Sequence, residues 1–260
     1  MEAFFPLDLE YWTVYLFVWA RLMGIVFLFP FFNYQGIPFT LRLWLSLVIA
    51  LLIFLSLEGS HPVLNFRGPL EMILLLGKEV LVGLALGYVV TLLFSVFLNA
   101  GQMVDLKSGL MLSGVFDPQF GSQVTFMGTF YYLLALVFFL SFNGHHYFLM
   151  SLAESYVIIP IDGPVMAQAQ AEGIIRIFAD IFALAFQLVA PIIIILMLMD
   201  IALGLIAKTV PQVHVFILGL PLKIAMSLLL LAMLAPVFGL VWEGLIDRFI
   251  LYLNQFMQGW

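Results

Sequence analysis

Charged side chains inside apolar segments are the residues of this sequence best suited to chemistry. Six of them lie within or beside long hydrophobic runs: Arg21, Lys78, Glu79, Asp180, Asp200 and Lys223. A charge at the centre of a bilayer costs roughly 2.5–3.5 kcal/mol on insertion scales, and such residues are usually paired or face protein or water. Two interpretations therefore stand side by side: a path for protons or ions, or structural pairing and contact between subunits.

The spacing of these charges favours pairing. Glu172, Arg176 and Asp180 are four residues apart, so on one helix they stack as an acid–base–acid ladder on one face. Asp200 and Lys208 are eight residues apart and also share a face. So many charges are unusual in a bundle that faces only lipid, and we expect much of the surface to face other protein chains.

Signatures of enzymes are missing from the sequence. There is no glycine-rich phosphate loop and no HExxH motif. His145 and His146 are adjacent and cannot chelate a metal as an i, i+4 pair, so we expect them at a turn after Asn143. Asp180 and Asp200 would lie about 30 Å apart on a continuous helix, too far for a protease dyad. Without cysteine there is no disulfide or thiolate site. We predict no enzyme, no cofactor and no metal.

Composition places the chain in a membrane. Of its 260 residues 65% are hydrophobic and 9% charged, whereas a soluble domain is about half apolar and roughly a quarter charged. The net charge of −6 is spread thinly, so no nucleic-acid partner is expected. The first ten residues carry acidic side chains and no Lys or Arg, so we expect no cleavable signal peptide.

The apolar runs predict an all-α, polytopic membrane protein. They cover residues 11–32, 37–57, 70–100, 126–142, 174–207 and 215–242. Two of them are too long for one upright span and predict tilted or extended helices. Pro191, Pro221 and Pro236 are expected to interrupt the last two runs. Residues 143–159 suggest an amphipathic or re-entrant stretch, and 243–260 an amphipathic terminal helix. No linker divides the chain, which predicts a single domain over 1–260.

Glycine has two expected uses here. Gly83 and Gly87 form a GxxxG motif, which lets two helices approach closely, either within the chain or with a partner. The segment from Gly101 to Thr125 is rich in glycine but also carries large apolar residues, so it is too polar for a span and too apolar for a solvated loop. It could form an apolar constriction inside a pore, or a surface loop with an amphipathic helix.

Three stretches carry a resemblance to a known family. They are GQMVDLKSGLMLSGVFDPQFGSQV from Gly101, NGHHYFLMSLAESY from Asn143, and LVAPIIIILMLMDIALGLIAKTVPQVHVFILGLPLKI from Leu188. Together they resemble the FliR family of flagellar type III export proteins over nearly the whole chain. Lys208 stands where arginine is expected and His214 where asparagine is usual.

The resemblance implies a fold of stacked helical hairpins, like a fused FliP and FliQ. It implies a hetero-oligomeric export gate in the bacterial inner membrane, at the flagellar basal body, with FliP-like and FliQ-like subunits, FlhB and FlhA as partners. Unfolded flagellar proteins would pass through it. A homologous virulence secretion subunit is the alternative; a small-solute permease would show inverted repeats, which the halves of this chain lack.

The resemblance also locates the plug loop of the gate at about 101–125. The predicted plug residues are Gly101, Asp105, Gly109, Leu110, Met111, Leu112, Gly114, Val115, Phe116, Asp117 and Pro118. The residues predicted to be buried charges or partner contacts are Arg21, Arg42, Lys78, Glu79, Arg176, Asp180, Asp200, Lys208 and Lys223.

Overall fold

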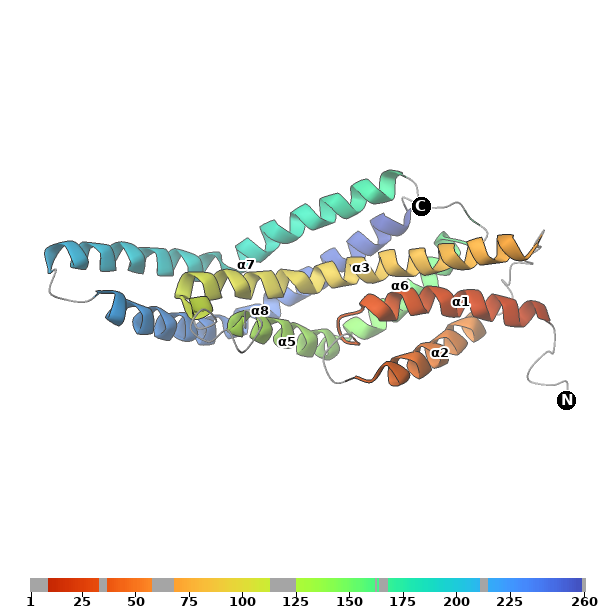
Figure 1. Cartoon of the computed structure of the whole chain (residues 1–260), viewed down its shortest axis with the longest axis horizontal. Coiled ribbons are helices and arrows are strands. Elements are labelled where there is room, and N and C mark those ends of the chain that lie inside the picture. Colours follow the sequence, from red (N-terminus) through yellow and green to blue (C-terminus); the bar gives the residue numbers. More distant parts are fainter. Residues whose placement is uncertain are drawn as a thin grey trace. The chain divides into compact units, whose positions relative to one another are not determined.

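The chain folds as helices. A computed structural model describes residues 9–32, 37–57, 68–112, 125–161, 163, 168–210 and 215–258. These residues form seven α-helices and one short 3-10 helix, with no strand among them (Figure 1). The predicted all-α class is confirmed.

The chain divides into two compact units. One contains Met1–Leu92, His145–Ile177 and Phe249–Trp260, and the other contains Leu93–Gly144 and Phe178–Arg248. Three long helices pass from one unit into the other: α3 (Pro69–Ser108), α7 (Gln168–Thr209) and α8 (Val215–Gln258). That the whole chain forms a single export-gate domain stays a prediction.

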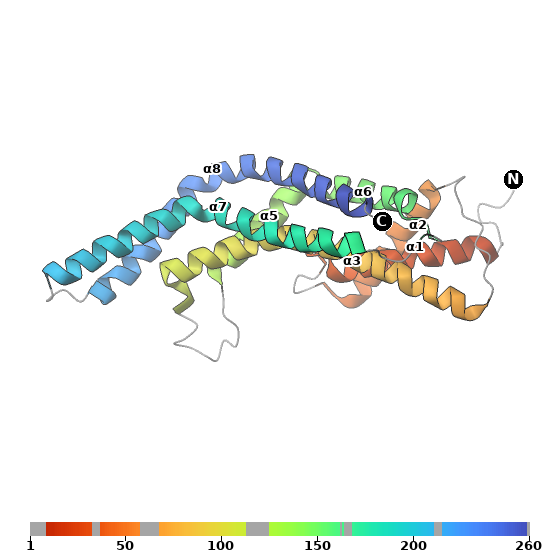
Figure 2. The ribbon, with the colours of Figure 1, turned by 90° about the horizontal axis from the view of Figure 1, so that it is seen from above.

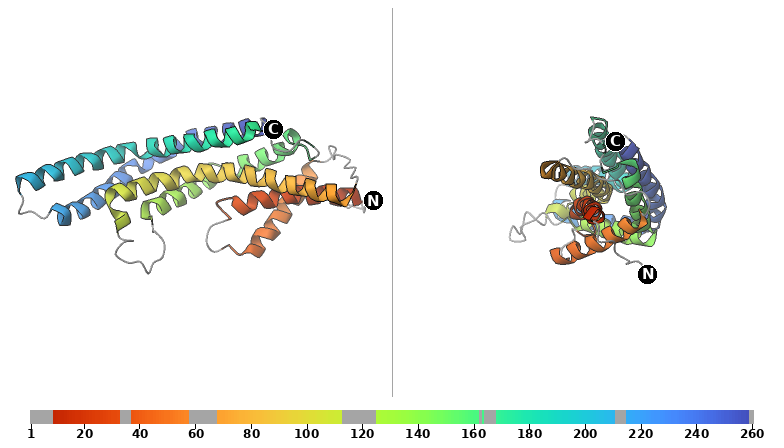
Figure 3. Two further views of the ribbon diagram at one scale, coloured as in Figure 1. Left: turned by 45° about the horizontal axis from the view of Figure 1, so that its top comes forward. Right: turned by 90° about the vertical axis from the view of Figure 1, so that its right-hand side faces the viewer.

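The first unit is built on a helical hairpin that packs against the first part of α3 (Figure 3). The hairpin consists of α1 (Leu9–Leu28) and α2 (Phe39–Ser56), and the unit also contains all but the first residue of α6 (Gly144–Ile158). Hydrogen bonds join the two arms: the Tyr15 hydroxyl donates to the Leu47 carbonyl at 3.1 Å, and the Trp19 indole N–H donates to the Ser46 hydroxyl at 3.1 Å. Polar side chains therefore hold this hairpin at its centre, between otherwise apolar faces.

The second unit has an aromatic core. It contains the end of α3, the 3-10 helix η1 (Leu110–Leu112) and α5 (Phe126–Ser141), together with most of α7 and α8. Trp242 of α8 is fully buried, with its ring 5.1 Å from Phe97 and 6.1 Å from Phe138. Tyr131 packs on Phe238 at 4.9 Å. Such tilted aromatic pairs bury a large apolar area and lock α8 against α3 and α5.

Helices α7 and α8 form an antiparallel hairpin, which ends at the far left of Figures 1 and 2. The Leu203 side chain of α7 packs against Gly219 of α8. Both helices continue past their prolines without a break, so the predicted interruptions at Pro191, Pro221 and Pro236 are wrong. Proline removes one backbone N–H, and a long apolar helix can lose that hydrogen bond without ending. The predicted separate terminal helix is likewise the continuation of α8.

Five described helices are long and apolar enough to cross a membrane. A sixth crossing is formed if α5 and α6 count as one span bent by 72°. Asn143, at the bend, has a φ of 57°, a left-handed conformation that asparagine tolerates better than most residues. The stretch predicted as amphipathic or re-entrant is the helix α6, which a sharp turn separates from α5.

Candidate functional site

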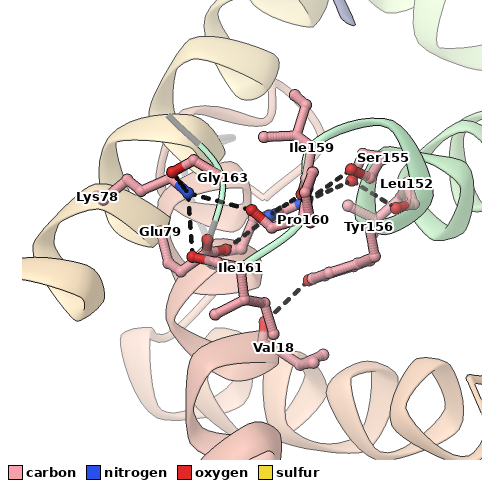
Figure 4. A network of polar contacts seen from close by, with 11 residues as sticks. Val18, Lys78, Glu79, Leu152, Ser155, Tyr156, Ile159, Pro160, Ile161 and Gly163 are labelled. Carbon is pink, nitrogen blue, oxygen red and sulfur yellow. Dashed lines mark hydrogen bonds and ion pairs between the residues drawn. The ribbon is translucent and has the colours of Figure 1, made fainter. Parts of the chain in front are cut away.

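Arg21 is the centre of a buried polar network in the first unit. Its guanidinium donates to the Glu79 carboxylate at 2.7 Å, to the carbonyl and hydroxyl of Ser155 at 2.9 and 3.1 Å, and to the Ile159 carbonyl at 2.8 Å. It also lies over the Tyr156 ring at 4.1 Å. Arg21, Glu79 and Ser155 are fully buried. The network joins α1, α3 and α6 at one point, which Figure 4 shows from close by.

Glycines bring α1 close enough to α3 for this network to form. A Cβ on Gly83 would overlap the carbonyl oxygen of Arg21 itself, and a Cβ on Gly24 would lie 2.5 Å from the Val80 carbonyl oxygen. A Cβ on Gly87 would lie 3.0 Å from the Ile25 carbonyl oxygen. The GxxxG motif thus packs against a helix of the same chain. Without side chains at these positions, the two backbones touch, and the Arg21 side chain reaches the carboxylate on α3.

Lys78, next to Glu79, is the second buried cation of the network. Its ammonium donates to the carbonyls of Pro160, Ile161 and Gly163 at 3.1, 3.0 and 2.8 Å (Figure 4). These carbonyls lie where the chain leaves α6. They lie just past the C-terminal end of α6, which carries partial negative charge, so a cation placed there stabilises the helix end.

The two cations therefore share one task. Arg21 binds the Ser155 carbonyl in the last turn of α6 and the Ile159 carbonyl directly after it, and Lys78 binds carbonyls further along the same stretch. Tyr156 adds a further link by donating its hydroxyl to the Val18 carbonyl at 3.1 Å. Of the two interpretations of these buried charges, the geometry favours structural pairing over an ion path. Removing one member of such a buried pair costs roughly 3–5 kcal/mol.

A second ion pair lies on the α7–α8 hairpin. Lys223 and Asp200 are 2.6 Å apart, with side chains 18% and 46% exposed. Asp200 and Lys208 lie on α7 eight residues apart, as the sequence predicts, and the ion-pair partner of Asp200 is on the next helix. Lys208 is exposed in the last turn of α7.

The remaining predicted charges lie at the surface of the chain or near it. Glu172, Arg176 and Asp180 follow one another along α7, and all three are exposed. Arg42, in the first turn of α2, donates to the Ile37 carbonyl at 3.3 Å. The ladder is therefore present by position, and what it contacts in an assembly stays a prediction.

The predicted plug segment begins as a helix, which corrects the expectation of a loop from Gly101 onward. Residues 101–108 are the last two turns of α3. Gly101 serves a close approach, because a Cβ there would overlap the backbone of Met127 and Gly128 on α5. Asp105 is fully buried. The helix ends at Gly109, whose φ of 87° is the left-handed conformation that favours glycine.

The apolar part of the plug segment is described only at its start. Leu110, Met111 and Leu112 form η1, and the side chains of Leu110 and Met111 are partly exposed. The other predicted plug residues lie outside the described residues: Gly114, Val115, Phe116, Asp117 and Pro118.

Some residues of the site were not singled out from the sequence. Ser155 and Tyr156 hold Arg21, yet a serine and a tyrosine in an apolar helix give no pairing signal by themselves. His145 and His146 are exposed at the start of α6, with ring centroids 6.5 Å apart. Within the described part of the chain, no group of three His, Cys, Asp or Glu side chains could hold a metal.

Long apolar helices with paired charges define a polytopic helical membrane protein. The family model for bacterial export proteins, family 1, matches residues 12–249. Flagellar biosynthetic protein FliR of Bacillus subtilis is 34% identical over 226 residues, 86% of each chain. The FliR of Pectobacterium carotovorum is 30% identical, over 91% of this chain and 90% of its own, and that of Escherichia coli is 26% identical, over 93% and 90%.

The chain belongs to the bacterial export proteins, family 1, the family of the flagellar biosynthetic protein FliR. Membership identifies it as a membrane-embedded component of the flagellar export apparatus. That family consists of export-apparatus components and is not a known family of enzymes.

Proposed function

We propose that this chain is a structural, pore-forming subunit of the flagellar type III export gate. It assembles with FliP-like and FliQ-like subunits in the inner membrane, at the basal body, and associates with FlhB and FlhA. Unfolded flagellar proteins pass through the assembled gate. The flagellar role, as opposed to virulence secretion, is supported by the relatives above, which are all flagellar proteins.

The observation that carries this proposal is the Asp200–Lys223 pair on the α7–α8 hairpin. Only 33% of the apolar window of α7 and 11% of the window in α8 are buried within the chain, against 61% for α3. An ion pair on so exposed a hairpin would be costly in contact with lipid. The hairpin therefore needs cover from other protein chains or from water, as a subunit of a pore provides.

Large apolar side chains around the pair support the same conclusion. Leu198 and Ile201 flank Asp200 and are each 60% exposed, and Leu222, beside Lys223, is 53% exposed. A surface that alternates apolar side chains with one partly exposed ion pair suits a protein interface, where the apolar area is buried and the pair sits at a rim or opposite a polar group.

The plug belongs to the same proposal. Leu110 to Phe116 would close the pore by apolar contact and by excluding water, and would yield when a substrate arrives. Its start, η1, carries partly exposed apolar side chains directly after the end of α3.

Co-expression tests the assembly. The chain is produced with FliP-like and FliQ-like proteins, extracted in mild detergent and analysed by size exclusion. One large complex with a minority of this chain is expected, with little folded chain when the partners are omitted. A monodisperse, folded monomer without partners would contradict the proposal, because it would mean that the exposed hairpin needs no cover.

Deleting Leu110 to Phe116 tests the plug. The deletion should leave the complex assembled but leaky to ions, seen as slowed growth and raised conductance, and Gly114→Val should reduce export by stiffening the segment. The control is Leu106→Ala, which trims an exposed side chain in the last turn of α3 and leaves residues 110–116 unchanged. A deletion variant that does not leak ions and exports at the normal rate would refute the proposal that these residues close the pore.

A further inference from the structure

Asp105 is a fully buried carboxylate inside a 40-residue apolar helix. An ionisable residue at such a place is by default suspected of moving ions or protons. Its contacts indicate something else. Both carboxylate oxygens accept the backbone N–H of Met127, at 3.0 and 3.1 Å, and one also accepts the N–H of Gly128 at 3.2 Å.

The N–H groups of Met127 and Gly128 occupy the positions that bond to an N-cap side chain at the start of a helix. α5 begins at Phe126, so Met127 and Gly128 are its second and third residues, whose N–H groups lack intrahelical partners. A side chain at the N-cap position usually accepts from these groups. The N-cap residue of α5 is Thr125, and its side chain makes no such bond. Asp105 fills that place from another helix.

The sign of the charge and the local packing agree with this role. The N-terminal end of a helix carries partial positive charge, which a carboxylate stabilises. The backbones of α3 and α5 come into contact at Gly101 and Gly128, so the short Asp105 side chain can reach across. The Asp105 carbonyl in turn accepts the Gly109 N–H at 3.2 Å, where α3 ends. One residue thus closes the end of α3 with its backbone and the start of α5 with its side chain.

We propose that Asp105 is a positioning residue that caps α5 from α3. The cap fixes the two helix ends from which the chain segment 109–125 departs, and the carboxylate serves as a hydrogen-bond acceptor and not as a carrier of protons or ions. Only the export readout below rests on the proposed function.

Amide exchange tests the cap directly. Asp105→Ala should raise hydrogen exchange at Met127 and Gly128 by about tenfold or more, the factor that corresponds to 1.4 kcal/mol. Asp105→Asn keeps an acceptor of similar capping strength and should leave exchange close to that of the natural chain. Ser108→Ala is the matched control, because Ser108 is buried one turn on and bonds neither amide. Unchanged exchange in Asp105→Ala would overturn the cap.

The export rate of Asp105 variants distinguishes capping of α5 from a role in carrying protons or ions. Asp105→Asn should export at nearly the natural rate, because it retains the acceptor and loses only the charge. Loss of export in Asp105→Asn with normal amide protection would overturn the proposal and assign the charge to transport. If Asp105→Ala does not accumulate, then an accumulating Asp105→Asn supports the cap, and failure of both overturns it. A natural chain that never assembles with its partners would refute the proposed function, while its amide exchange would still test the cap.

Discussion

Enlarging Gly83 by one methyl group should damage the first unit far more than the size of the change suggests. The added Cβ would overlap the Arg21 carbonyl oxygen and lie 2.9 Å from the carbonyl carbon and 3.2 Å from the Cα of the same residue. All three are backbone atoms, so no side chain can swing away. Relief requires α1 to move from α3, and Arg21, which contacts Glu79 at 2.7 Å, lies at the point of that movement.

Two costs add in this variant. Overpacking a tight site costs typically 1–3 kcal/mol, and the rigid backbone places Gly83→Ala in the upper part of that range. Separating a buried ion pair leaves uncompensated charges, at roughly 3–5 kcal/mol when it is complete. We expect at least about 3 kcal/mol of destabilisation, which for a chain of this size lowers the melting temperature by roughly 6–12 °C.

The assay compares two glycines of the same helix. The complex is purified with each variant and its melting followed by intrinsic fluorescence. Gly77→Ala is the control, because a Cβ on Gly77 meets nothing within 4 Å, and alanine is the better helix former by up to about 1 kcal/mol. Gly77→Ala should therefore melt at or above the natural temperature. If both variants melt together, the close approach of α1 and α3 does not determine stability and the reasoning is wrong.

Three further predictions concern the charges. Asp200→Ala or Lys223→Ala should each lower the yield of co-purified complex, and the exchange Asp200→Lys with Lys223→Asp should restore part of it. Equal yields for all variants would show that the ion pair does not contribute to the interface. Arg176→Ala should lower the yield by leaving carboxylates unpaired under a partner, with partial recovery when Arg176→Asp is combined with Asp180→Arg. Unchanged yield and export in the single variants would make that ladder a solvated face. Arg21→Leu should abolish accumulation of the chain in membrane fractions, measured by immunoblot, since it leaves a buried carboxylate uncompensated; normal accumulation would contradict the network.

Apolar run length was sufficient to predict the helices themselves. The runs at 37–57 and 126–142 differ by at most two residues at either end from α2 and α5, and the overlong run at 70–100 is the single helix α3. A helix that spans a bilayer needs about 20 apolar residues and pairs all its backbone groups internally, so hydropathy along the sequence indicates where such helices lie. Proline misled the prediction, because it removes one backbone hydrogen bond and the helix continues past it.

Glycine was harder to interpret, because it serves two unrelated needs. Glycine allows a left-handed turn, and it also allows two backbones to touch. Gly109 adopts the left-handed turn, with a φ of 87°. Gly101 allows the backbone of α3 to contact that of α5. Read together from the sequence, they suggested one irregular loop. The position of α5 beside α3 is needed to tell these two uses of glycine apart.

Partners across helices were the least predictable feature. Spacing along one helix tells which residues share a face, such as Asp200 and Lys208, but not which residue on another helix either of them meets. Hairpin geometry gives the better rule. Asp200 lies nine residues before the end of α7 and Lys223 eight residues after the start of α8, so antiparallel packing brings them level. That rule needs the position of the turn, which the sequence indicates only approximately.

Three of the buried charges match helix ends in sign. Arg21 and Lys78 bind carbonyls where α6 ends, at its negative pole, and Asp105 binds amides where α5 begins, at its positive pole. Charges used in this way are each held by more than one backbone group. Among the described residues, the buried charged side chains thus hold helices together. This agrees with a subunit that forms a conduit and leaves the supply of energy to other parts of the export apparatus.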